Sequence, residues 1–130
     1  MALTALIILL LLIQYMVFSA LTGRARVKFD IRAPDCAGHP SFERIYRVQM
    51  NTLEHLIVVI PALWICGLFF NPYWVGPLLG LVFFVARTLY AVGYVKNPKS
   101  RGLGMLLGSI ASGALVLMGI YATVMEMLYV

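Results

Sequence analysis

The chain has 130 residues, of which 62% are hydrophobic and only 12% are charged. Soluble domains average about 45–50% apolar and about 25% charged residues, so this composition excludes an ordinary water-soluble enzyme. Ten Lys and Arg residues against five Asp and Glu residues give a formal net charge of +5. Because the basic residues lie in short connections between apolar runs, we expect an integral membrane protein and no nucleic-acid partner.

Four apolar runs predict four transmembrane helices. A helix needs about 20 residues to cross the hydrocarbon layer, and a crossing segment must satisfy its own backbone hydrogen bonds. The length leaves no room for a separate soluble domain, so we expect one membrane domain over residues 1–130. Its fold class is an all-α antiparallel bundle of four transmembrane helices, covering about residues 2–22, 41–70, 73–95 and 102–130.

Basic residues are concentrated in two of the three connections. Six lie in residues 23–47 and three in residues 96–102, whereas the two termini and the Asn71-Pro72 turn carry none. The positive-inside rule therefore places the first and third connections in the cytoplasm and both termini on the opposite side.

Local signals refine two of the predicted helices. Ser41 is a suitable N-cap and Glu43 complements the positive end of a helix dipole, so the second helix is expected to begin near Ser41. Small residues at helical spacing predict that the third and fourth helices pack closely against their neighbours. They are Gly76 and Gly80 in the third helix, and Gly104, Gly108 and Ser112 in the fourth.

Polar side chains form two stripes that enter the membrane. At about 100° per residue, the stripe on the second helix spans an arc of about 100° and that on the third about 60°. The first consists of Arg44, Arg47, Asn51, Glu54 and His55, and the second of Arg87, Tyr90 and Tyr94. Because charges facing lipid are costly, the two stripes are expected to face each other or a ligand.

Two interpretations of these stripes remain open. Glu54 and Arg87 lie at a similar depth, about 10 Å below the cytoplasmic end, and are candidates for a structural ion pair. That pair would leave Arg26, Arg47 and Arg101 without acidic partners at this level. Arginine grips carboxylates bidentately, so the surplus cations favour a small zwitterionic ligand with several carboxylates, such as a short acidic peptide. No metal site is predicted, because the two Cys and two His residues form no ligand pattern.

The segment Phe42–Glu54 reads FERxxRxQxNxxE, and it resembles the MAPEG family, the membrane-associated proteins of eicosanoid and glutathione metabolism. The likeness continues through Ala86-Arg87, Tyr90, Gly93, Tyr94, Asn97-Pro98 and Arg101. It is strongest to the branch of microsomal glutathione transferases and leukotriene-C synthases, with this chain as a bacterial-type member. The resemblance implies a homotrimer that holds glutathione between neighbouring subunits at the cytoplasmic side, with the bacterial inner membrane as the expected location.

The resemblance also implies a set of glutathione-binding residues. Carried over by position, they are Arg26, Arg47, Gln49, Asn51, Glu54, His55, Tyr90, Tyr94 and Arg101. Gln49 lies about 140° from Arg44 on a helical wheel, so only a subunit interface would bring it to the same site. The chain departs from the family pattern at His55, where leukotriene-C synthase has a tyrosine, and at Val27, where it has a second arginine.

The chemistry implied by this likeness is attack by the glutathione thiolate, with glutathione as co-substrate and no metal. A free thiol has a pKa of about 8.5, so a nearby guanidinium would favour its charged form, and Arg101 is the expected catalytic residue. The acceptor would be a lipophilic electrophile or a lipid hydroperoxide that arrives through membrane lipid, which makes the protein a transferase, a peroxidase or both.

Two other functions are compatible with four apolar helices. One is a non-catalytic lipid-binding protein that resembles the 5-lipoxygenase-activating protein, and the polar set with Arg101 argues against it. The other is a small multidrug exporter, which needs a membrane-embedded carboxylate in its first helix. The first predicted helix here contains Gln14 and no acid.

Overall fold

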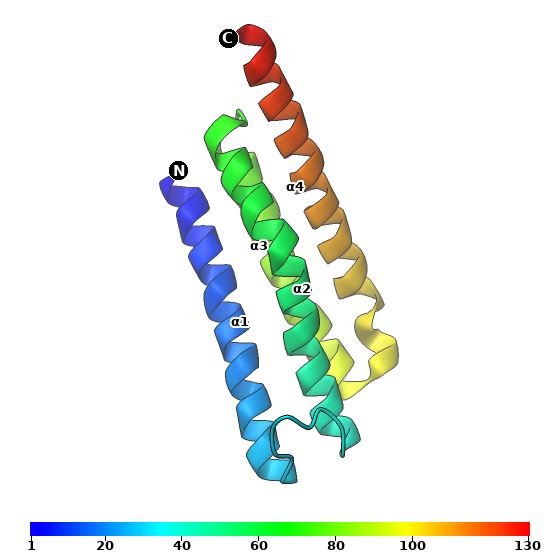
Figure 1. Ribbon diagram of the computed structural model, residues 1–130. Helices are drawn as coiled ribbons and strands as arrows, with labels where there is room; N and C mark the ends of the chain where they lie inside the picture. Colours follow the sequence, from blue (N-terminus) through cyan, green and yellow to red (C-terminus); the bar gives the residue numbers. More distant parts are fainter.

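The computed structural model describes residues 1–130 as four long helices and one short 3₁₀ helix, with no strands. The helices run alternately up and down, and both termini lie at the same end (Figure 1). All four are long and apolar enough to cross a membrane, which confirms the all-α, four-span architecture. The elements are α1 (Ala2–Phe29), α2 (Pro40–Phe69), α3 (Val75–Lys96), η1 (Pro98–Arg101) and α4 (Gly102–Tyr129).

The first helix is longer than its apolar run. It continues to Phe29 rather than ending near Thr22, and Asp30 ends it in the left-handed conformation at φ 52°. Hydropathy marks where a helix leaves lipid, not where its hydrogen bonding stops. The basic side chains Arg26 and Lys28 in the last turn complement the negative end of the helix dipole and extend α1 into the headgroup region.

The second helix begins where expected but with a different cap. His39 is the N-cap, and its Nδ1 accepts a hydrogen bond from the Ser41 amide at 3.1 Å. Ser41 cannot be the cap because Pro40, which has no amide hydrogen, already occupies the first helical position. Glu43 lies in the first turn, as the dipole argument requires.

Two glycines allow the helices to approach closely. A Cβ at Gly104 would lie 2.6 Å from Tyr90 N and 2.7 Å from Ala86 O, so α4 rests directly on the backbone of α3. A Cβ at Gly80 would lie 2.6 Å from Ile7 Cγ2 on α1. Close packing through small residues is therefore confirmed at both positions.

The interior of the bundle is an apolar core shared by all four helices. Its fully buried members include Leu11, Val59, Leu63, Phe83 and Leu115. Only 30 of the 130 residues are buried, and many large apolar side chains are exposed on the outer surface of the bundle. An exterior of this kind is stable only against lipid or against other subunits, as expected of an integral multi-pass membrane protein.

Candidate functional site

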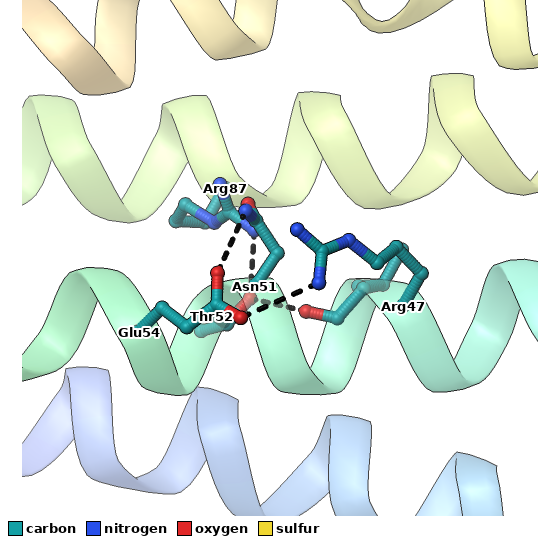
Figure 2. A network of polar contacts seen from close by, with 6 residues as sticks. Arg47, Asn51, Thr52, Glu54 and Arg87 are labelled. Carbon is teal, nitrogen blue, oxygen red and sulfur yellow. Dashed lines mark hydrogen bonds and ion pairs between the residues drawn. The ribbon is translucent and has the colours of Figure 1, made fainter. Parts of the chain in front are cut away.

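Three members of the polar stripe of α2 contact one another at the surface of the bundle. Arg47 Nη1 contacts Glu54 Oε1 at 3.3 Å, and Asn51 Nδ2 donates to Glu54 Oε2 at 3.5 Å (Figure 2). The Arg47 and Glu54 side chains are 51% and 55% exposed. An ion pair this exposed contributes little to stability, so both groups can exchange partners for a ligand at small cost.

Glu54 and Arg87 do not form the ion pair considered from the sequence. Arg87 is only 1% exposed, and its Nη2 donates to Thr52 Oγ1 at 2.9 Å (Figure 2). Equal depth is not sufficient for pairing, because Glu54 points outward to Arg47 whereas Arg87 is enclosed between α2 and α3. Sequence reasoning missed Thr52; its signal is a hydroxyl one position from Asn51, on the buried side of a polar stripe.

The two tyrosines of α3 are stacked. The rings of Tyr90 and Tyr94 have centroids 5.5 Å apart with an interplanar angle of 6°, and the Arg87 guanidinium lies 4.2 Å from the Tyr90 centroid. A Cβ at Gly93 would lie 2.8 Å from Ser100 O, so η1, which carries Arg101, packs against the end of α3 that carries the two tyrosines. Arg101 is exposed and makes no ion pair within the chain.

His55 lines a cavity of about 450 Å³ between α2 and α4, together with Glu54, Val58, Ser109 and Ser112. Neither serine was predicted to line a site, and Ser112 was assigned only to helix packing, although hydroxyls three residues apart on a membrane helix were a usable signal. Val58 also lines an apolar groove of about 490 Å³ that continues between the same two helices. A polar recess thus adjoins a groove suited to a hydrocarbon chain.

These observations define the open face, a set of groups on α2, α3 and η1 with few partners in their own chain. Its members are Arg47, Asn51, Glu54, His55, Tyr90, Tyr94 and Arg101. The open face combines two guanidiniums, a carboxylate, an amide, an imidazole and two phenols. Such a set can bind carboxylates, an ammonium group and an anionic sulfur.

The remaining two sequence-predicted residues lie elsewhere. Arg26 Nη1 donates to Asp35 O at 2.7 Å, and its guanidinium lies over the rings of Phe42 and Tyr46 at 5.0 and 5.8 Å. We call this cluster, Arg26 with Asp35, Phe42 and Tyr46, the loop corner. Gln49 Nε2 donates to Tyr15 Oη at 3.3 Å, so Gln49 faces α1, away from the open face, as the helical wheel predicts.

Comparison with known proteins identifies the chain's relatives. Residues 4–121 match the MAPEG family. The chain is 40% identical over 112 residues to the uncharacterized protein sll1147 of Synechocystis, covering 86% of this chain and 81% of that protein. It is 36% identical over 106 residues to human microsomal glutathione S-transferase 2, covering 82% and 71%.

A third relative is leukotriene C4 synthase of Rattus norvegicus, 32% identical over 124 residues and covering 88% of this chain and 82% of that enzyme. The matched region includes α2 and α3 entirely, most of α1 and α4, and every residue of the open face. The chain belongs to the MAPEG family.

Proposed function

We propose that the protein is a membrane-bound glutathione transferase that activates the glutathione thiol for attack on lipophilic electrophiles. The observation that carries this proposal is the open face, where Arg47 and Glu54 form only an exposed pair and the exposed guanidinium of Arg101 makes no ion pair in its own chain. Relatives named glutathione S-transferase and leukotriene C4 synthase support the choice of ligand.

Glutathione complements the open face group by group. It is a tripeptide with two carboxylates, an ammonium group and a thiol. Arg47 suits a carboxylate, because a guanidinium can donate two parallel hydrogen bonds. Glu54 suits the ammonium group, and Asn51, Tyr90 and Tyr94 supply neutral hydrogen bonds. His55 lines the recess beside Glu54, where the bound peptide would continue towards α4.

Arg101 is the proposed catalytic residue. Its guanidinium favours the thiolate over the thiol, and the thiolate then attacks the electrophilic atom of the acceptor. In conjugation a C–S bond forms and the leaving group departs with the electron pair. In hydroperoxide reduction the sulfur attacks the terminal oxygen, the O–O bond breaks, and the lipid leaves as an alkoxide that takes a proton; the thiol of a second glutathione then displaces water from the sulfenic acid to give the disulfide. Neither route requires a metal ion.

Acceptors would enter laterally from the membrane. The apolar groove between α2 and α4 meets the polar recess at Val58, so a lipophilic acceptor could place its tail in the groove and its reactive group near Glu54 and His55. Conjugation then occurs next to the lipid in which the acceptor dissolves. Val27, which stands where leukotriene-C synthase has a second arginine, is exposed and apolar, so this chain has no guanidinium at that position.

A homotrimer would complete the site. Within one subunit, Arg26 is held in the loop corner and Gln49 faces α1, so neither joins the seven residues of the open face. Contact between the loop corner of one subunit and the open face of the next would join them. Arg26 uses only Nη1 within its chain, which leaves its other nitrogens for such a ligand. The first and third connections would then face the cytoplasm, the source of glutathione, in the bacterial inner membrane.

The test is calorimetric titration of the purified protein in detergent with glutathione, followed by conjugation of glutathione to a chloro-dinitrobenzene and reduction of a lipid hydroperoxide. We expect saturable binding and turnover with at least one acceptor class. Absence of glutathione binding would contradict the proposal.

A second candidate is a lipid-binding protein without chemistry, which the apolar groove of about 490 Å³ favours. Saturable glutathione binding with no turnover on any electrophile or hydroperoxide would support this alternative. Binding of a fatty acid by a protein that turns over no acceptor would support it further.

A further inference from the structure

Arg87 is a buried charge without a counter-ion. It is the largest side chain that the fold encloses completely, and it lies inside the membrane-spanning helix α3. Its Nε has no hydrogen-bond partner, and the only ion pair in the chain is that between Arg47 and Glu54. A guanidinium at this depth is costly, and a residue needed only for packing does not require one.

Tyr90 is the only residue whose aromatic ring contacts the Arg87 guanidinium. The Arg87 guanidinium carbon lies 4.2 Å from the Tyr90 ring centroid, and Tyr94 stacks on Tyr90 at 5.5 Å. The three residues follow each other on one face of α3 at spacings of three and four. The ring of Tyr90 is therefore held between the guanidinium and the ring of Tyr94.

The hydroxyl group of Tyr90 remains available although its ring is buried. It makes no hydrogen bond within the chain, and the buried polar atoms without a partner are Gln14 Oε1 and Arg87 Nε alone. The Tyr90 hydroxyl is therefore not fully buried and can accept or donate a hydrogen bond from outside the chain. A cation over the ring withdraws electron density from the π system and makes the phenol a stronger hydrogen-bond donor.

We infer that Arg87 is a positioning residue that orients the Tyr90 ring and strengthens the hydrogen bond its phenol donates to an anionic group of bound glutathione. This role rests on the proposed function, because it needs glutathione at the open face. Arg87 itself touches no ligand. Thr52 holds the guanidinium in place: its hydroxyl donates to Val48 O at 2.7 Å and accepts from Arg87 Nη2 at 2.9 Å.

A double-mutant cycle tests this role in the full-length protein in detergent. Arg87→Met should raise the KM for glutathione about fivefold and change kcat less than about twofold. Arg87→Lys should recover part of the loss, because it restores a cation. Tyr90→Phe should also raise KM, and Arg87→Met should then add little, because its effect passes through the missing phenol.

Equal effects of Arg87→Met with and without the Tyr90 hydroxyl would overturn the inference, as would a fall in kcat with KM unchanged. Failure of the unaltered protein to bind glutathione would instead overturn the proposed function, and this role with it. The two failures are therefore distinguishable.

A milder variant decides the question if Arg87→Met does not fold. Thr52→Val keeps the shape of the side chain but removes the hydrogen bond to Arg87, and should raise KM about twofold. Thr22→Val is the matched control, since the buried Thr22 hydroxyl also donates to the carbonyl four residues earlier but contacts no arginine. Identical KM values for the two variants would overturn the inference.

Discussion

The open face and the loop corner both carry arginines at the same end of the bundle, but their surroundings differ. In the loop corner, Arg26 is held by a backbone carbonyl and two aromatic rings of its own chain. On the open face, Arg47 has only an exposed carboxylate and Arg101 has no ion-pair partner. The loop corner is thus a preassembled support, whereas the open face is complete only with a ligand.

The largest expected effect belongs to the open face. Arg101→Ala should reduce the conjugation rate about 100-fold, because the thiolate loses its stabilising cation, while glutathione still binds. Steady-state kinetics and calorimetric titration of the same preparation separate the two effects. Lys99→Ala, a neighbouring exposed cation on η1, is the control and should leave both unchanged. Equal loss of binding and turnover in Arg101→Ala would refute its assignment to the thiolate.

The second-largest expected effect is on the affinity of the open face for glutathione. Glu54→Ala should weaken glutathione affinity about 30-fold, because the ammonium group loses its charged partner. Its melting temperature should change little, since Glu54 and Arg47 form an exposed pair. Glu126→Ala, an exposed acid near the other end of α4, controls for the loss of a negative charge. Unchanged affinity in Glu54→Ala would remove Glu54 from the site.

A mixing experiment sharpens the comparison between the two regions. The double variant Arg26→Ala/Gln49→Ala should weaken glutathione binding about tenfold if these residues reach a neighbour's ligand. Coexpression with Arg101→Ala should restore activity at about a quarter of the sites, since these sites would combine an intact Arg26 and Gln49 from one subunit with an intact Arg101 from the next. No recovery in the mixture would place each site within one subunit.

The smallest expected effect is a loss of stability from a change in the connection between α1 and α2. His39→Ala removes the N-cap of α2 and a ring stacked on Phe29 at 4.0 Å. It should cost about 1 kcal/mol of stability, read as a lower melting temperature in detergent, and leave glutathione affinity unchanged. A large loss of affinity would show that the N-terminus of α2 depends on this cap for its position at the site.

Hydropathy and helical periodicity were sufficient to predict much of this structure. The four spans follow from the apolar runs, and the contact of Arg47 and Glu54 on one face of α2 follows from the 3.6-residue period. Periodicity also assigned Gln49 to a different face from Arg44, and its hydrogen bond to Tyr15 on α1 agrees. These features depend on the sequence of one helix at a time.

The remaining features depend on contacts between segments, which composition and period do not encode. Glu54 and Arg87 lie at similar depths, but whether their side chains meet depends on how α2 is rotated about its axis relative to α3. In the structure, this rotation turns Thr52 rather than Glu54 towards Arg87. The end of α1 at Phe29 depends on the dipole and headgroup region rather than on hydropathy. The N-cap of α2 is His39 rather than the predicted Ser41, because Pro40 occupies the first helical position.

The most direct test of the central claim is the ultraviolet difference spectrum of bound glutathione, measured against pH in the unaltered protein and in Arg101→Ala. The account predicts thiolate absorbance well below the pH at which the free thiol, with its pKa of about 8.5, ionises. It also predicts that this absorbance shifts back towards that pH in Arg101→Ala. A bound thiol that titrates like the free one in the unaltered protein would contradict the account.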